Sequence, residues 1–440
     1  MKSVEQIIIP KWIAPVDQAD SIHHDFGIAV DAGRVVAVDS ASELLSRYRA
    51  DSTVRLDDHA IIPGLVNAHT HAPMTLFRGL ADDLPMQIWL NDHIWPAESR
   101  WVDQAFIEAG SDLACAEMIR GGTTCFNDMY FFPDMVARRA EACGIRACVG
   151  MIVIEFPTVW AKDADEYISK GLELRESLGD SSLVTACFAP HAPYTVSNST
   201  LSRIAGLSHD LDCRVHIHLH ETVEEVERSV SEFGIRPIER LRRLGLMNER
   251  MMAVHMTQLH HHEIGLLHEC RANVLHCPES NLKLSSGVCP AAELVRQGVN
   301  VALGTDGAAS NNDLDMIGEM RTASLFAKIA SGSAEALDAY TTLRSATLNG
   351  ARALGLEQDI GSIETGKMAD LVAIDLSSPA TQPCYNPVSQ IVYSASRDQV
   401  SDVWVAGRRL LENGRLVTID ENRAVSVAQK WCNKIASHGR

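Results

Sequence analysis

The sequence predicts an α/β protein: a (β/α)8 TIM-type barrel with a small composite β-sandwich domain formed by both termini. Three observations predict this fold. Eight short apolar runs alternate with helical stretches, most of these runs end in polar residues, and both flanks carry short alternating strands with glycine turns. A chain of 440 residues has room for a barrel of about 250 residues or more plus a smaller unit.

The eight apolar runs are rich in β-branched residues and are the predicted barrel strands. Amphipathic segments long enough to be crossover helices lie between them, as at 133–142, 222–233 and 290–297. Strands that alternate with helices in this way indicate a parallel sheet that closes into a barrel. The predicted strands are 61–69, 123–128, 146–154, 184–191, 214–221, 251–255, 272–276 and 300–306.

The two flanks form the predicted second unit. Short alternating strands lie at 27–30 and 35–38 in the first flank, and at 369–374 and 403–407 in the second. Neither flank is a convincing domain alone. We therefore expect residues 1–60 and 364–440 to build one β-sandwich beside a barrel of residues 61–363.

Composition excludes several functions. Lys plus Arg total 39 against 57 Asp plus Glu, a net charge of -18, so the chain lacks the positive charge needed to bind nucleic acid or an anionic membrane. No apolar run approaches the length of a membrane span, and the 11 cysteines are scattered without a Cys-x-x-Cys pair. We expect a cytoplasmic protein with reduced cysteines and a small-molecule partner, assembled as a homo-oligomer whose order no motif specifies.

Polar residues cluster at the carboxyl ends of the predicted strands, which is where the active sites of such barrels lie. Capping of the following helix could explain Asp306 by itself, but it explains histidines poorly because His is not a favoured N-cap. The residues at these ends are His69, His71, His191, Glu221, His255, His276 and Asp306.

Histidines on two predicted strands indicate a metal site. His69 and His71 are two residues apart and can therefore point to the same side of a strand. On the fifth strand His216, His218 and His220 share one face, so the two-residue period of a strand cannot show which of them is the ligand. The spacing His-x-x-Glu selects His218 as the ligand and Glu221 as the general acid/base. We expect His216 and His220 to pack in the core or to hydrogen-bond to the ligands.

Asp306 completes the predicted site, either as a fourth ligand or as the group that takes a proton from water. Imidazole nitrogens plus one carboxylate oxygen suit Zn²⁺ or Fe²⁺ better than Mg²⁺ or Ca²⁺. We predict one zinc ion per subunit, with iron left open. The tract 260–262, three histidines before an apolar stretch, is predicted to be a polar helix start and not a ligand set.

The motifs at 63–71, 218–221, 255, 304–306 and 361–371 resemble those of the amidohydrolase superfamily over nearly the whole chain. Many members carry two metals bridged by a carboxylated lysine at the end of the fourth strand. Here that position reads Ala-Pro-His-Ala-Pro-Tyr-Thr at 189–195, with no lysine. The resemblance is therefore to the branch with one metal, which contains deaminases and chlorohydrolases.

Within that branch the chain is most similar to 5-methylthioadenosine/S-adenosylhomocysteine deaminases, through 69–83, 89–91, 95–98, 190–194 and 277–284. The resemblance implies hydrolytic deamination of the adenine amine of 5-methylthioadenosine, S-adenosylhomocysteine or adenosine, giving the inosine analogue and ammonia. It implies a metal held by His69, His71, His218 and Asp306, and nucleoside contacts by Glu98, which would bind the ribose hydroxyls, and by His191, Glu221 and Asp306.

Two observations favour 5-methylthioadenosine among these substrates. Relatives that accept the homocysteine group need cations near the site, whereas the loop region 151–180 offers only Lys162, Lys170 and Arg175, without a clear placement. An apolar pocket for the methylthio group is expected from Met74, Leu84, Met86 and Trp89, for which core packing is an equal explanation.

The expected mechanism assigns a role to each of three polar residues at the strand ends. Glu221 donates a proton to the ring nitrogen, Asp306 moves the proton of the attacking water to the leaving amine, and His255 orients the hydroxide. Two alternatives stand beside it. One is a deaminase or chlorohydrolase of another aminated heterocycle, such as guanine or a triazine, and the other is a non-catalytic scaffold.

Overall fold

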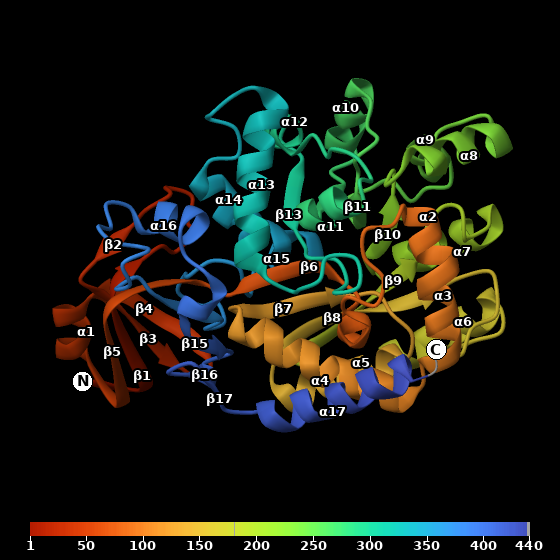
Figure 1. Ribbon diagram of the computed structural model, residues 1–440. Helices are drawn as coiled ribbons and strands as arrows, with labels where there is room; N and C mark the ends of the chain where they lie inside the picture. Colours follow the sequence, from red (N-terminus) through yellow and green to blue (C-terminus); the bar gives the residue numbers. More distant parts are fainter. Residues whose placement is uncertain (180, 438–440) are drawn as a thin grey trace.

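A computed structural model describes residues 1–179 and 181–437 of the chain, and it confirms the predicted fold class. Eight parallel strands form one sheet in the order of the sequence, and helices cover its outer face (Figure 1). The strands are β6 Leu65–Thr70, β7 Thr123–Asp128, β8 Arg146–Val153, β9 Val184–Pro190, β10 Val215–Leu219, β11 Met251–His255, β12 Asn273–His276 and β13 Asn300–Leu303.

The first and last strands close the barrel. Asn67 Nδ2 donates to Thr305 Oγ1 over 2.7 Å, and the Thr305 amide donates to Asn67 Oδ1 over 3.0 Å. The Asp306 amide donates to the His69 carbonyl over 3.0 Å. These bonds lie at the carboxyl ends of β6 and β13, so the closure also fixes the two chain segments that carry the predicted metal ligands.

Two barrel-strand ends differ from the prediction by three or more residues. The first barrel strand begins at Leu65 and not at 61, because Ala60 to Pro63 pair with β14 in the other sheet. The last strand stops at Leu303 and not at 306, and Asp306 has a φ of 63°, in the left-handed region. A non-glycine residue there turns the chain sharply, which ends the strand before the polar residue.

The two termini build a second, mixed sheet. Nine strands are hydrogen-bonded into one sheet in the order β17-β16-β15-β14-β5-β1-β3-β4, with β2 paired to β1 (Figure 1). Their bounds are β1 Lys2–Ile13, β2 His23–His24, β3 Phe26–Asp31, β4 Arg34–Ser40, β5 Tyr48–Pro63, β14 Leu371–Asp375, β15 Val400–Val405, β16 Arg408–Glu412 and β17 Arg415–Leu416.

This mixed sheet folds back on itself. The turn between β3 and β4 meets the turn between β15 and β16, where a Cβ on Gly407 would lie only 3.0 Å from Gly33 Cα. The Ala369 amide donates to the Gly33 carbonyl, also across this gap. Side chains from both halves, such as Ile28 and Trp404, share one buried cluster, so the sheet encloses a core as a sandwich does.

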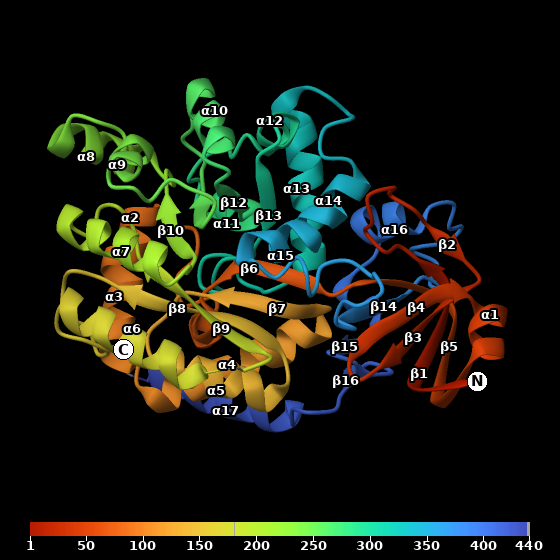
Figure 2. The ribbon, with the colours of Figure 1, turned by 180° about the vertical axis from the view of Figure 1, so that it is seen from behind.

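Helices surround the barrel, and the view from behind shows the same arrangement (Figure 2). The helices of the described residues are α1 Ala41–Arg47, which packs on the mixed sheet and not on the barrel, α2 Met86–Ile88, α3 Trp95–Trp101, α4 Gln104–Arg120, α5 Pro133–Cys143, α6 Ala164–Leu178, α7 Asn198–Asp210, α8 Val223–Phe233, α9 Pro237–Arg243, α10 His261–Glu269, α11 Pro278–Lys283, α12 Ala291–Arg296, α13 Met316–Ser331, α14 Ala339–Ser345, α15 Leu348–Leu354, α16 Pro387–Tyr393 and α17 Glu421–Ala436, with short η1 Ala72–Phe77, η2 Trp89–Ile94 and η3 Arg397–Gln399.

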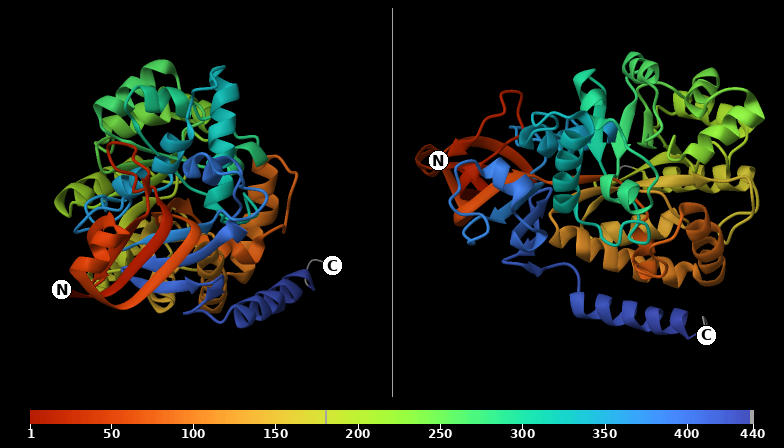
Figure 3. Two further views of the ribbon diagram at one scale, coloured as in Figure 1. Left: turned by 90° about the vertical axis from the view of Figure 1, so that its left-hand side faces the viewer. Right: turned by 45° about the horizontal axis from the view of Figure 1, so that its top comes forward.

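The C-terminal helix α17 leaves the mixed sheet and lies along the barrel (Figure 3). Its Trp431 packs edge-on against Phe106 of α4, with ring centroids 5.4 Å apart. The tract 260–262 begins α10 as predicted, since His260 is the N-cap and its backbone amide bonds to Glu263 Oε2 over 2.7 Å.

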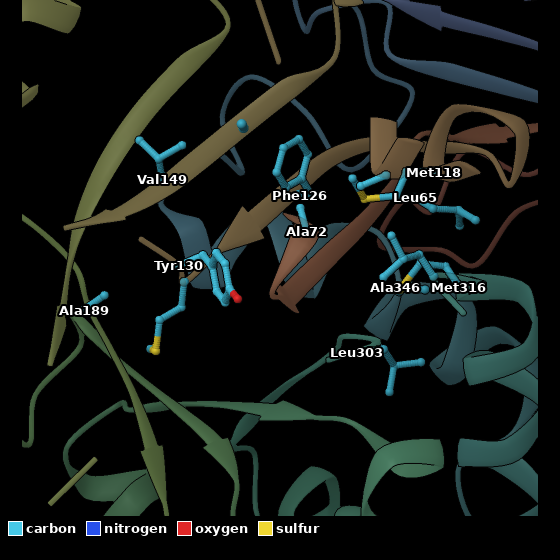
Figure 4. Packing of buried hydrophobic residues seen from close by; sticks show 14 of the residues in the cluster. Leu65, Ala72, Met118, Phe126, Tyr130, Val149, Ala189, Leu303, Met316 and Ala346 are labelled. Atoms are coloured by element: carbon cyan, nitrogen blue, oxygen red, sulfur yellow. The ribbon is translucent and has the colours of Figure 1, made fainter. Parts of the chain in front are cut away.

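Apolar side chains fill both sides of the barrel wall. Outside the wall, Leu65 of β6, Phe126 of β7 and Met118 of α4 pack in one buried cluster (Figure 4). Inside the barrel lie smaller side chains, among them Cys125 and Cys148. All 11 cysteines are free and most are buried. Within the described residues, no helix is long and apolar enough to cross a membrane.

Candidate active site

Strand β6 supplies the first two predicted ligands. Its pairing with β7 shifts register between Asn67 and Thr70, and such a bulge re-aims the side chains beside it. His69 is fully buried, and the ring centroids of His69 and His71 are 4.8 Å apart. His71 Nδ1 lies 2.5 Å from the Met129 carbonyl, to which it donates, so Nε2 is the nitrogen that would bind a metal on losing its proton.

Strands β10 and β11 add two more imidazoles. The His218 and His255 rings stack at 16° with centroids 5.5 Å apart, and the His218 ring centroid lies 5.0 Å from that of His69. His218 Nδ1 donates to the His191 carbonyl over 2.8 Å. His218 Nε2 is thereby left as a lone-pair donor, which is the form that binds a metal.

Asp306 faces this group from the turn after β13. Its Oδ1 lies 3.3 Å from His69 Nε2 and 3.2 Å from His71 Nε2. Its Oδ2 accepts a hydrogen bond from Ser280 Oγ over 2.7 Å. One carboxylate oxygen is therefore turned toward the imidazoles, and the other is held from outside the cluster.

These groups fit a metal ion. Ligand atoms of His69, His71 and Asp306 lie within 4.8 Å of one another, and so do those of His69, His218 and His255. His69 Nε2 is buried and faces Asp306 Oδ1 at 3.3 Å without a well-aligned hydrogen bond to any described residue. A buried nitrogen without a well-aligned hydrogen bond costs free energy unless something binds it, and imidazoles with one carboxylate are a donor set that suits zinc.

The charges of the site reflect burial and close contact. Burial lowers the pKa of His69 to about 4, against the opposing contact with Asp306. Burial would also lower the pKa of His71, but Asp306 outweighs it and raises that pKa to about 9. Although burial opposes ionisation of Asp306, the two imidazoles hold its pKa well below the usual range. The carboxylate is therefore ionised and able to bind a cation.

Glu221 stands at the rim, just beyond β10. Its Oε1 lies 3.7 Å from His255 Nε2 and accepts a hydrogen bond from Ser286 Oγ over 3.4 Å. Burial raises the pKa of Glu221. A carboxyl group with a raised pKa is suited to donate a proton near neutral pH.

His71, His218, His255, Glu221 and Asp306 line one cavity of about 480 Å³, whereas His69 is buried and does not line it. Glu98 of α3 also lines this cavity, and His191 lines it with its ring centroid 5.0 Å from that of His218. Burial raises the pKa of Glu98 to about 7, with the neighbouring Tyr130 hydroxyl acting against the shift. Of the predicted apolar pocket, Met74, Met86 and Trp89 line the cavity, joined by side chains such as Ile94, Trp95 and Phe156, whereas Leu84 does not.

No Lys or Arg side chain of the described residues lines this cavity. Lys170, one of the cations considered from the sequence, donates to the Trp160 carbonyl over 2.5 Å, and Arg175 bonds to the Leu211 carbonyl over 3.2 Å. The cavity is therefore apolar and acidic in character. His191, at its wall, has a pKa lowered to about 3 by burial and by His71 and His69.

The other strand-end histidines lie outside the cavity. His216 Nε2 is 2.8 Å from His69 Nδ1, and His220 Nε2 accepts a hydrogen bond from the Ile238 amide over 3.1 Å. His216 therefore hydrogen-bonds to His69, and His220 is buried in the core, which are the two alternatives expected for these histidines. His276 is buried, and its Nδ1 has no hydrogen-bond partner among the described residues.

Sequence reasoning did not assign a role to two residues that bond to this site. Ser280 bonds to Asp306, and Asn281 Oδ1 lies 2.9 Å from His255 Nδ1. Both lie in the segment 277–284, which contributed to the family resemblance without a function. That resemblance was the only signal that could have identified them.

A parallel barrel with imidazoles and a carboxylate gathered at its strand ends defines a metal-dependent hydrolase. The profile of the amidohydrolase family matches residues 60–410. The chain belongs to the amidohydrolase family.

Similar proteins agree with this assignment. The chain is 45% identical over 435 residues to a 5-methylthioadenosine/S-adenosylhomocysteine deaminase of Teredinibacter turnerae, covering 99% of this chain and 98% of the relative. It is 43% identical over 403 residues to a 5'-deoxyadenosine deaminase of Methanothermobacter thermautotrophicus, covering 91% and 93%. The crystal structure of an adenosine deaminase from Xanthomonas campestris with bound zinc superimposes with a TM-score of 0.98 at 49% identity, covering 99% of both chains.

Proposed function

We propose that this chain is a zinc-dependent deaminase that replaces the adenine amine of 5-methylthioadenosine by oxygen and releases ammonia. One observation carries the proposal. A single cavity joins the cluster of imidazoles and Asp306 to Glu98 through walls that are mostly apolar. A purine nucleoside matches these features, with its amine at the imidazole cluster, its ribose diol at Glu98 and its 5' substituent at the apolar wall.

One zinc ion is assigned to His69, His71, His218 and Asp306. The assignment is supported by the backbone contacts of His71 Nδ1 and His218 Nδ1, which leave Nε2 of each ring for a metal, and by the buried His69 Nε2, which has no well-aligned hydrogen bond. Zinc bound there supplies a Lewis acid that lowers the pKa of the attacking water toward neutrality. The zinc bound in the Xanthomonas campestris structure supports the choice of metal over iron.

Two residues of this chain then move protons, and a third orients the water. Glu221, whose pKa is raised by burial, donates to the ring nitrogen beside the carbon that carries the amine. His255 orients the attacking water from beside Glu221. Asp306 takes the proton of that water and passes it to the amine, which leaves as ammonia. Each such transfer typically contributes about 10²–10⁴-fold in rate.

Glu98 and the apolar wall define the substrate. Ribose hydroxyls donate to the Glu98 carboxylate, and Trp95, one turn earlier on the same helix, lies near the position of the 5' substituent. With no cation on the cavity wall, a homocysteine carboxylate has no partner there, which favours the methylthio group. His191 contacts the base from the wall beside the metal-binding cluster.

An ammonia-release screen of purified, metal-analysed protein tests this proposal. The substrates are 5-methylthioadenosine, S-adenosylhomocysteine, adenosine, guanine and a triazine. The proposal requires the highest kcat/KM for 5-methylthioadenosine. Loss of nucleoside turnover in Glu98→Ala with activity on a free base intact would instead support a free-base hydrolase. A purified chain that holds no metal and releases no ammonia would support a scaffold.

A cytoplasmic location and a homo-oligomer complete the proposal. The free cysteines support the first, because a reducing compartment keeps thiols unpaired. Light scattering of the purified protein measures the second. The charge of -18 supports a small-molecule partner over nucleic acid.

A further inference from the structure

The short helix α11 lies behind the active site and does not line its cavity. It begins after β12 with the sequence Pro-Glu-Ser-Asn-Leu-Lys, and Ser280 and Asn281 are buried on it. Each of these two polar side chains bonds to a different residue that is assigned a role in the reaction. Neither lines the cavity, so their effect on the reaction acts through those partners.

Ser280 fixes the orientation of Asp306. It is fully buried, and its hydroxyl donates to Asp306 Oδ2 over 2.7 Å. The Gly307 amide donates to Oδ1 over 2.7 Å, so both oxygens are held. With Oδ2 bonded to Ser280, Oδ1 is the oxygen that faces the imidazoles of His69 and His71.

Asn281 fixes the tautomer and the plane of His255. The Asn281 side-chain oxygen lies 2.9 Å from His255 Nδ1 and accepts a hydrogen bond from its N–H, so the lone pair is on Nε2. His255 Nε2 faces Glu221 Oε1 at 3.7 Å. His255 itself has a φ of 72°, a strained backbone conformation for a residue other than glycine.

The helix is itself anchored away from the site. The Glu279 amide donates to Glu319 Oε2 over 3.3 Å, and Glu279 Oε1 accepts a hydrogen bond from Thr322 Oγ1 over 2.7 Å. Both partners belong to α13, on the outside of the barrel. At the other end, Lys283 Nζ pairs with Asp82 at 2.7 Å. Ser280 and Asn281 are thus held from both ends of a rigid element.

We propose that α11 is the positioning element of this active site, in which Ser280 aims the Asp306 carboxylate at the metal and Asn281 holds His255 in the tautomer that the reaction needs. The role of Asn281 rests on the proposed function, because it acts through the catalytic role of His255. The role of Ser280 in metal binding depends only on the assignment of Asp306 as a ligand.

The two variants Ser280→Ala and Asn281→Leu have different expected signatures. Ser280→Ala raises the zinc Kd and lowers kcat, each by about 10–100-fold, the range for residues that hold metal ligands. Asn281→Leu lowers kcat by about 10–100-fold and leaves the zinc Kd within about 3-fold, because His255 is not an assigned ligand. KM stays within about 2-fold in both variants, since neither residue lines the cavity.

Matched controls separate positioning from packing. Ser324→Ala removes a fully buried hydroxyl that bonds to the Leu337 carbonyl over 2.6 Å, and Asn273→Leu removes a buried amide that bonds to the Met251 carbonyl over 3.0 Å. Both lie outside the site and are expected to change the melting temperature alone. Ser280→Thr and Asn281→Asp keep a donor and an acceptor, and are expected to recover most of the lost kcat.

The experiment measures zinc Kd by chelator competition and kcat and KM by ammonia release, on full-length variants with melting temperatures recorded. Zinc affinity and kcat of both variants within about 3-fold of their matched controls would overturn the inference. A wild-type chain that binds zinc but deaminates no nucleoside would overturn the proposed reaction and the role of Asn281. The zinc titration of Ser280→Ala would still decide the role of Ser280.

Discussion

Glu98 gives the sharpest test of substrate recognition, because its pKa of about 7 falls within the working range of the assay. Only the ionised carboxylate accepts hydrogen bonds from both ribose hydroxyls. Above pH 7 the group is ionised, and below it the group is protonated. With a pKa of about 7 the ionised fraction is about ten elevenths at pH 8 and about one eleventh at pH 6, so KM for a ribonucleoside is expected to rise about tenfold over that interval.

The substitution Glu98→Gln removes this titration and the charge together. A hydrogen bond to a charged group contributes about 1.5–3 kcal/mol, so KM at pH 8 is expected to rise by about 10–100-fold and to lose its dependence on pH between 6 and 8. Ammonia release at several pH values gives KM for the variant, for wild type and for Glu227→Gln, an exposed carboxylate on α8 that serves as control. A variant that keeps the wild-type KM, or its slope with pH, would refute the assignment of Glu98 to the ribose.

Three further predictions follow from other parts of the molecule. Glu221→Gln keeps its zinc but loses about 10²–10⁴-fold in kcat, measured by ammonia release beside metal analysis. Asp370 pairs with the buried Arg146 at 3.0 Å, so Asp370→Ala leaves the Arg146 charge buried without its ion-pair partner. The free energy of unfolding, measured by urea titration, is expected to fall by about 3–5 kcal/mol, while kcat per folded molecule is unchanged. The wild-type kcat/KM for 5-methylthioadenosine exceeds that for S-adenosylhomocysteine by at least about tenfold, since the cavity wall offers the carboxylate no cation.

Each of these three predictions has a result that contradicts it. Near-normal ammonia release by Glu221→Gln would remove it as the proton donor. An unchanged urea midpoint in Asp370→Ala would show that the buried pair does not stabilise the junction of barrel and mixed sheet. Equal kcat/KM values for the two nucleosides would show that the homocysteine group is accommodated despite the missing cation.

The barrel and the positions of the assigned ligands were predictable because their signals are local. The run 123–128 is β7 and the run 251–255 is β11 to the residue, since an apolar stretch of β-branched side chains ending in a polar group is read directly from the sequence. The ends of β6 and β13 were not predictable. The first depends on pairing with β14, some 300 residues away, and the second on the left-handed turn at Asp306.

Long-range contacts within the site were equally beyond local patterns. Nothing in the spacing of Ser280 and Asn281 indicates that one bonds to Asp306 and the other to His255, because each contact depends on the closed barrel. By contrast, the selection of His218 from three histidines relied on Glu221 three residues later, a local feature. The structure places His218 among the cluster and His216 behind His69.

The number of zinc ions per chain tests the central claim most directly. Metal-free protein titrated with zinc, and measured by inductively coupled plasma mass spectrometry after gel filtration, is predicted to bind one ion per chain with deaminase activity rising in proportion. His218→Ala is predicted to bind no zinc at the concentration that saturates wild type. Two tightly held ions per chain, or a His218→Ala variant that retains its zinc and its activity, would contradict the single site proposed here.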